Sequence, residues 1–284
     1  MGAKPIARWI LLPLIALPAG AVRSLGQAGA PVLSQGEAQA LVQRALAEET
    51  DAAKNGSRPM RYTLRKITPR LTTTKEIIET SDGDVARLTE VNGEPLSEAA
   101  EQREMSRLNA LAANQADQDH RKQTEDNDRA RAIKILRALP KAFVYTYTGP
   151  GTSAAAPVET YSFAPRPGYS PSGTETQILT AMTGTIAVDP SAGRVTHLEG
   201  HLRKDVNFGW GIVGRLNKGG WMAIDQARVA DGQWRTVRLQ LAMTGRIVFF
   251  TKTYDTLQEQ SDYRPVAEGL DYREAIRQLS ASSF

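Results

Sequence analysis

The second half of the chain is made of short segments in which apolar and polar side chains alternate. The segment WRTVRLQLAM, residues 234–243, is the clearest case, because Leu239, Leu241 and Met243 fall on one face of an extended chain and Arg238 and Gln240 on the other. A period of two is typical of a strand with one buried face. Repeated segments of this kind favour an antiparallel sheet with one apolar side.

Six further segments after Pro140 are strand-like, and clusters of Gly, Pro, Asp and Ser separate them. They are AFVYTYT, VETYSFA, TGTIAVD, RVTHLEGHLRKDV, WMAIDQARV and RIVFFTKTY. Earlier in the chain MRYTLRKI alternates too, with Tyr62 and Leu64 on its apolar side. Residues 72–91 follow as two apolar runs around an Asp-Gly pair, which predicts a hairpin.

Two helical regions are expected in the first half of the chain. Ser34 and Glu37 have the spacing of a capping box, which predicts a helix that runs to about Asn55. Residues 97–139 are also helical in composition, but their middle, residues 113–131, has no apolar side chain larger than alanine. We expect this charged middle to be a solvent-exposed insertion, with a lid or a docking arm for a partner as the alternative.

The N-terminal residues have the order of a secretory signal. Lys4 and Arg8 precede an apolar run, residues 9–20, and small residues follow it. We expect cleavage after Ala28, which removes residues 1–28 and leaves residues 29–284 as a single domain. Cleavage after Ala21 or after Ala30 is the alternative. The apolar run is short for a membrane span, so an uncleaved anchor is the second interpretation.

Charge and cysteine content narrow the class of protein. The chain has 35 basic and 31 acidic residues, and residues 1–28 hold three of the bases and no acid, so the remainder is close to neutral. Both signs are interleaved, which argues against nucleic acid as a partner. The chain has no cysteine, so it has neither disulfide bonds nor a thiol for lipid attachment. Together with the signal this predicts a periplasmic protein.

Two histidines flank a glutamate in the segment RVTHLEGHLRKDV, which raises the question of a metal site. If the segment is a strand, the Cα atoms of His197 and His201 are about 13 Å apart, too far for both to hold one tetrahedral metal ion. We interpret His197, Glu199 and His201 as the solvent side of a strand whose apolar side holds Leu198 and Leu202. Metal binding through Glu199 and one histidine is the alternative.

The order of these features resembles a known superfamily. GTIAVDPSAGRVTHLEGHL and WMAIDQARVADGQWRTVRLQLAMTGRIVFF are similar in cadence to the strand repeats of the periplasmic lipoprotein carriers, the LolA- and LolB-like half-barrels, in which a D-x-x-x-G-R turn joins two strands. The resemblance implies an α+β fold, with a large curved antiparallel sheet, an open half-barrel, and helices packed on its concave face. It also implies a cavity that holds acyl chains or an apolar peptide segment.

The predicted function is a periplasmic binding protein for an apolar ligand such as a lipid or an acylated protein. Its ligand would lie on the apolar face of the sheet, which the sequence assigns to Tyr62, Leu64, Leu198, Leu202, Leu239 and Leu241. The alternative is an envelope interaction or assembly protein that docks a partner on helix 113–131 without a small ligand. No serine is placed beside a histidine and an acid, so we expect no catalysis, no cofactor and no metal.

Overall fold

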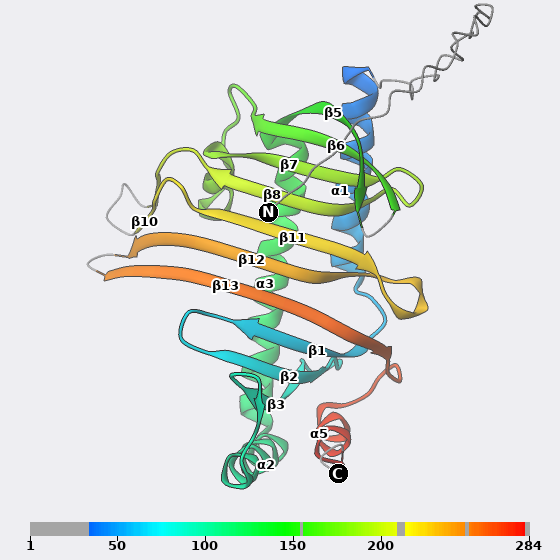
Figure 1. Ribbon diagram of the computed structural model, residues 1–284, viewed down its shortest axis with the longest axis vertical. Helices are drawn as coiled ribbons and strands as arrows, with labels where there is room; N and C mark the ends of the chain where they lie inside the picture. The colour runs from blue at the N-terminus through cyan, green and yellow to red at the C-terminus, as the bar shows by residue number, and fades with distance from the viewer. Residues whose placement is uncertain (1–33, 154–155, 209–213, 248–249, 282–284) are drawn as a thin grey trace, which may run out of the picture. The chain divides into compact units, whose positions relative to one another are not determined.

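The computed structural model describes residues 34–153, 156–208, 214–247 and 250–281. Within them, thirteen strands form one antiparallel sheet, accompanied by five α-helices (Figure 1). The helices are α1 (Gln35–Asn55), α2 (Glu98–Ala113), α3 (Gln115–Ala142), α4 (Thr174–Gln177) and α5 (Tyr272–Ala281), with 3-10 turns η1 (Ile178–Thr180) and η2 (Ala230–Gly232). The strands are β1 (Met60–Ile67), β2 (Thr72–Ile78), β3 (Val85–Val91), β4 (Glu94–Pro95), β5 (Phe143–Ser153), β6 (Ala156–Pro165), β7 (Met182–Asp189), β8 (Arg194–Leu202), β9 (Val206–Phe208), β10 (Gly214–Leu216), β11 (Trp221–Arg228), β12 (Trp234–Ile247) and β13 (Phe250–Pro265).

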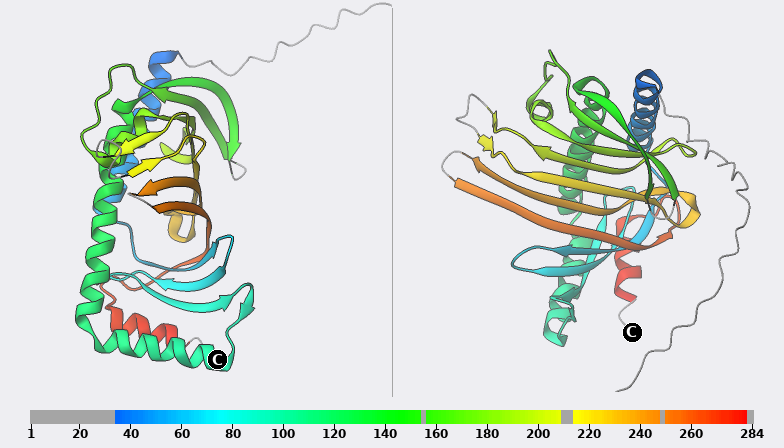
Figure 2. Two further views of the ribbon diagram at one scale, coloured as in Figure 1. Left: turned by 90° about the vertical axis from the view of Figure 1, so that its left-hand side faces the viewer. Right: turned by 45° about the horizontal axis from the view of Figure 1, so that its top comes forward.

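The sheet is open and curved. Its strand order is β4-β3-β2-β1-β13-β12-β11-β8-β7-β6-β5. Outside this order, β10 pairs with β12, and β9 pairs with β10. The end strands β4 and β5 do not pair with each other in the described part of the chain. Figure 2 shows α3 running across the strands on the concave side of the sheet. The expected α+β fold, a curved antiparallel sheet with helices on its concave face, is confirmed.

Most of the predicted strands occur where the alternation indicated them. Strand β1 coincides with MRYTLRKI, and β2 and β3 form the hairpin around Asp82-Gly83. The segment RIVFFTKTY was wrong as a single strand, because Ile247 ends β12 and its register partner Phe250 begins β13. The run from Ile247 to Phe250 is apolar and has no turn residue, so composition alone does not mark the end of a strand there.

Helix α1 begins as its capping box predicts. The Ser34 hydroxyl accepts a hydrogen bond from the Glu37 amide at 3.3 Å, and the Glu37 carboxylate accepts one from the Ser34 amide at 2.8 Å. The Ser34 hydroxyl also donates to the Glu37 carboxylate at 2.7 Å, and this bond and the one from the Ser34 amide hold the pKa of Glu37 below its usual value. The helix buries Val42 and Leu46 along one side.

Two apolar clusters form the core. The larger one joins α1 and the end of α3 to the sheet from β5 to β8, with Tyr145, Tyr161 and Ile186 almost completely buried. The smaller one joins β2 and β3 to α2 and α5, around Leu108 and Leu279. Helix α3 extends over 28 residues, so its C-terminal end packs in the larger cluster while its N-terminal half lies at the β2–β3 turn.

The charged N-terminal half of α3, which holds most of residues 113–131, is mostly exposed but also contacts the rest of the fold. Gln118 is completely buried, and its side-chain nitrogen donates to the carbonyls of Asp82 at 2.8 Å and Gly83 at 3.0 Å. The Glu125 carboxylate accepts the amide of Asp84 at 3.0 Å. The expectation that residues 113–131 only face solvent was therefore wrong at these positions. Polar contacts, which hydrophobic patterning does not reveal, dock the helix on the turn.

Candidate functional site

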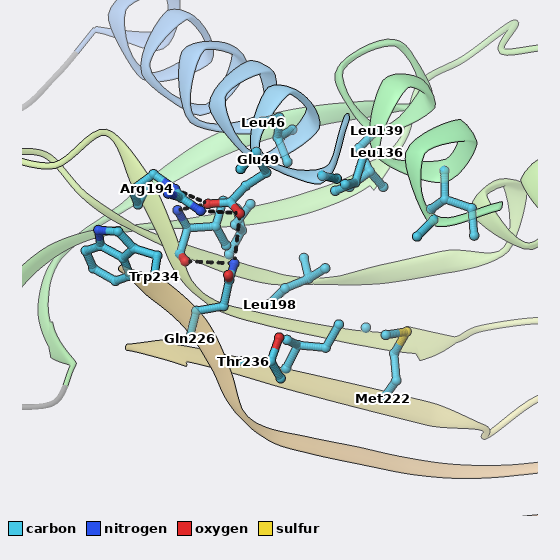
Figure 3. Close-up of a pocket in the computed structure, with 18 of the residues that line it drawn as sticks. Leu46, Glu49, Leu136, Leu139, Arg194, Leu198, Met222, Gln226, Trp234 and Thr236 are labelled. Carbon is cyan, nitrogen blue, oxygen red and sulfur yellow. Dashed lines mark hydrogen bonds and ion pairs between the residues drawn. The ribbon is translucent and has the colours of Figure 1, made fainter. Parts of the chain in front are cut away.

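An apolar pocket of about 820 Å³ lies between α1, α3 and the concave face of the sheet (Figure 3). This volume is within the range of about 300–1,000 Å³ that is common for small-molecule sites. The apolar lining comes from α1, α3, η1 and strands β5 to β8 and β11, and includes Leu46, Ile135, Leu136, Leu139, Phe163, Leu179, Met182, Ile186, Leu198, Met222 and Ile224.

The register of the strands explains why the floor of the pocket is apolar. Leu198 of β8, Ile224 of β11 and Leu239 of β12 are neighbours across the sheet, and Ile186 of β7 lies on the other side of Leu198. Residues opposite each other on antiparallel strands point to the same face. The alternation within each strand thus adds up to one apolar row across four strands.

The two helices leave room for the pocket by presenting small side chains to it. Ala52, Ala53 and Gly56 contribute from the end of α1, and Ala132 contributes from α3. Larger residues at these positions would occupy the space that the strands and helices enclose. At these positions the small side chains leave space open beside larger lining residues of the same helices, such as Leu46 and Leu136.

One end of the pocket is polar. Glu49 of α1 lies on the same side of the helix as Leu46 and Ala53, and its carboxylate binds Arg194 of β8 through two hydrogen bonds, Nε to Oε1 at 2.7 Å and Nη2 to Oε2 at 2.9 Å. The same carboxylate accepts the Val195 amide at 3.2 Å and the Gln226 side chain at 3.2 Å. Figure 3 shows this group beside Trp234, at the opposite end from Leu136 and Met222.

A second arginine at this end is paired as well. Arg235 of β12 lines the pocket, and its guanidinium donates to the two oxygens of Glu79 at 3.1 and 3.0 Å and to the carbonyl of Arg58 at 2.6 Å. The Arg194 guanidinium also lies 5.8 Å from the centre of the Trp234 ring, within the range of a cation–π contact. The polar end is therefore a set of internally paired groups.

The structure places the six residues predicted for the apolar face in different surroundings. Leu198 lines the pocket. Leu202 is buried in the larger core cluster, and Leu241, opposite Met222, packs against that cluster. Leu239 is opposite Ile224, and Leu64 is opposite Gln260 of β13.

Tyr62, the sixth of these residues, contacts protein rather than an open cavity. Its ring stacks on that of Tyr263 with centroids 5.0 Å apart, and burial raises the pKa of its hydroxyl. Contact of any of the six with a ligand stays a prediction.

Residues 194–202 of the histidine segment form strand β8, with Leu198 and Leu202 toward the core as predicted. The prediction of one strand up to Val206 was wrong, because β8 ends at Leu202 and Val206 begins β9. His197, Glu199 and His201 are partly exposed on the other face. His197 Nδ1 is 2.6 Å from Asp225 Oδ1, and His201 Nε2 is 2.6 Å from Glu199 Oε1. Among the described residues, no three or more His, Asp and Glu side chains are grouped closely enough to hold a metal ion.

Titratable groups also lie close together where the N-terminal half of α3 contacts the β2–β3 turn. Burial raises the pKa of Asp84 to about 7, and the nearby charges of Glu125 and Glu79 add to the effect. Arg129 and Arg235 oppose it. Asp84 belongs to the segment 82–84 that contacts α3, so its charge bears on how the helix docks.

The sequence reading missed Glu49, Arg194, Gln226 and Trp234. A signal existed for Glu49, because Val42, Leu46 and Glu49 have the spacing of a single helix face, so a carboxylate stood on an apolar stripe. Its partner Arg194 is 145 residues away in the sequence, and only the fold reveals that pairing.

Comparisons with known proteins find distant structural neighbours. No protein-family model and no curated protein matches the chain. An outer membrane lipoprotein-sorting protein domain from Vibrio parahaemolyticus has 10% identity and a TM-score of 0.33 over 84% of this chain and 99% of its own. A DUF1329 family protein from Desulfovibrio piger has 12% identity and a TM-score of 0.27 over 82% of this chain and 95% of its own.

A third neighbour is the MucA/MucB complex of Pseudomonas aeruginosa, with 11% identity and a TM-score of 0.24 over 81% of this chain and 99% of the matched chain. The neighbours thus include a lipoprotein-sorting domain, the class that the order of elements in the sequence resembles. No helix in the described residues combines the length and hydropathy that crossing a membrane requires. The predicted signal, residues 1–28, lies outside the described residues.

Proposed function

We propose that the chain is a periplasmic binding protein that holds the acyl chain of a lipid or of an acylated protein in the pocket under α1 and α3. The observation that carries this proposal is an apolar cavity of about 820 Å³ whose walls come from the concave face of an open sheet. The small residues Ala53 and Ala132 support it, because they keep the helices from filling that space.

The apolar lining supplies enough free energy for such a ligand. Each methylene moved from water into an apolar site contributes about 0.8 kcal/mol. The walls around Leu136, Leu198 and Met222 offer this environment along the pocket (Figure 3). Affinity should therefore depend mainly on the length of the chain that enters.

The periplasmic location rests on the N-terminal sequence. Residues 1–28 have the charged, apolar and small-residue order of an export signal. The absence of cysteine agrees with a chain that is neither acylated itself nor held by disulfide bonds.

The proposal is one of binding without catalysis. The acidic side chain that lines the pocket, Glu49, accepts four hydrogen bonds from Arg194, Val195 and Gln226. A carboxylate so occupied is poorly placed to accept a proton from a substrate. The geometry thus favours a site that holds its ligand unchanged.

The pocket can be tested by filling it. In the variant Ala53→Leu/Ala132→Leu, each leucine takes room from about two methylenes of a ligand, so a neutral fluorescent apolar probe should bind about tenfold more weakly or worse. The matched control Ala47→Leu/Ala130→Leu makes the same changes on the same two helices, at exposed positions that do not line the pocket, and should bind as the wild type does.

The natural ligand can be sought by mass spectrometry of an organic extract of protein secreted through its own N-terminal segment and purified without detergent. We expect acyl lipid with the wild type and the control, and less with the filled variant. Should the wild type carry no apolar molecule and bind no probe, the proposal fails, and an interaction protein that uses the exposed side of α3 becomes the better account.

A further inference from the structure

We propose that the polar end of the pocket selects an uncharged head group, such as the hydroxyls or ester of a neutral glyceride, over a carboxylate, a phosphate or an amine. This inference rests on the proposed function and specifies the class of ligand. It follows from the charges that surround the pocket and from how they are paired.

The first pair is Glu49 with Arg194. The carboxylate and the guanidinium meet through two parallel hydrogen bonds of 2.7 and 2.9 Å, the geometry in which an arginine is most fully engaged by a carboxylate. Glu49 is only 8% exposed. Because water screens this pair little, a charged group placed beside it would interact strongly with the nearer partner.

The second pair is Arg235 with Glu79. Both oxygens of Glu79 accept from Arg235, and Glu79 also accepts the Met60 amide at 3.0 Å. Each arginine that lines the pocket thus already has a carboxylate of its own. Two lining arginines would ordinarily indicate a site for an anion, but here the two pairs together carry no net charge.

The consequence differs for each kind of head group. An anionic head at this end would meet the Glu49 carboxylate, and a cationic head would meet Arg194 (Figure 3). Either would have to be desolvated without an unpaired counter-charge to receive it. An uncharged head avoids both repulsions and can hydrogen-bond to neutral side chains that also line the pocket, Ser57, Gln233 and Thr236.

The test compares three ligands with the same twelve-carbon chain and different heads: 1-monolauroylglycerol, laurate and dodecylamine, each below its aggregation concentration at pH 8. Carboxylic acids are ionised and alkylamines are protonated at this pH. The glycerol head is therefore uncharged, the laurate head carries one negative charge, and the dodecylamine head carries one positive charge. We expect the glyceride to bind about tenfold more tightly than either ion, because an unfavourable charge contact of about 1.4 kcal/mol corresponds to that ratio.

Two variants test the cause of the selectivity. Glu49→Gln keeps the shape of the side chain and leaves Arg194 without its carboxylate, so laurate should gain about tenfold relative to the glyceride. The double variant Glu49→Gln/Arg194→Gln removes both charges and should favour the glyceride again. Glu259→Gln, at the exposed pair with Arg65, is the matched control and should bind as the wild type does.

The outcomes separate the two proposals. If none of the three ligands binds the wild type, the proposed function itself fails. If all three bind with equal affinity, or if laurate or dodecylamine binds most tightly, the pocket holds acyl chains but the head-group inference is overturned. This comparison uses the wild type alone, so it decides the question even if Glu49→Gln does not fold. A folded Glu49→Gln protein with unchanged preference would also refute the role of the pair.

Discussion

Replacing Asp84 with asparagine should stabilise the protein at neutral and alkaline pH and have little effect in acid. Burial raises the pKa of Asp84 from 3.8 to about 7, and Glu125 and Glu79 contribute to the shift. A carboxyl whose pKa is higher in the folded state binds its proton more tightly there, so its contribution to stability is present below pH 4 and is lost as the pH rises through 7.

The structure sets the size of this effect. Each unit of pKa shift corresponds to 1.36 kcal/mol, so the shift of Asp84 has an upper limit of about 4 kcal/mol. Solvent reaches this half-buried site and screens part of the interaction, which leaves about 1–3 kcal/mol. Asparagine has nearly the same shape and no charge, and it removes this penalty at pH 8.

Urea unfolding of the wild type, Asp84→Asn and Asp82→Asn from pH 4 to pH 8 measures the effect. Asp82 lies in the same turn and serves as the matched control. The gain in unfolding free energy for Asp84→Asn should grow with pH and level off above about 7, while the control stays flat. A gain for Asp84→Asn that is absent, or that is equal at pH 4 and pH 8, would refute the reasoning.

Two further pairs of substitutions test the packing. Gly83→Ala should destabilise the fold by about 1–3 kcal/mol, because φ is +98° and the new Cβ would lie 3.1 Å from the Gln118 side-chain nitrogen, whereas Gly93→Ala, with φ of +83° and no atom within 4 Å, should cost less. Leu202→Ala should cost about 2–5 kcal/mol in thermal or urea unfolding, because Leu202 is 2% exposed, and Leu71→Ala, at 43% exposed, should change stability by under about 0.5 kcal/mol. Equal costs within either pair would contradict the packing described.

The sequence predicts the local structure well where one strong signal acts alone. The capping box places the start of α1 at Ser34, alternation places β1 at residues 60–67, and the Asp-Gly pair places the β2–β3 turn. It fails at the β12–β13 hairpin, where the run around Ile247 has no turn residue. Signals of this kind describe a segment and its neighbours and carry no information on distant contacts.

The pocket depends on contacts between distant segments, which explains why the sequence indicates its floor but not its polar end. Leu198 belongs to the apolar side of a strand and could be assigned from alternation. The ion pair between Glu49 and Arg194 joins α1 to β8. Gln118 can be buried because its side-chain nitrogen donates hydrogen bonds to two backbone carbonyls of another segment. Such pairs follow from the register of the sheet and the position of the helices.

The most direct test of the account is the affinity of wild-type protein for monoacylglycerols of eight, ten, twelve and fourteen carbons, measured by titration calorimetry. A chain that lies in the pocket between α1, α3 and the sheet should gain about 0.8 kcal/mol per methylene, or about fifteenfold for each added pair of carbons. The filled variant Ala53→Leu/Ala132→Leu should lose this gain at a shorter chain length. Affinity that does not depend on chain length, or no binding across the series, would contradict the account.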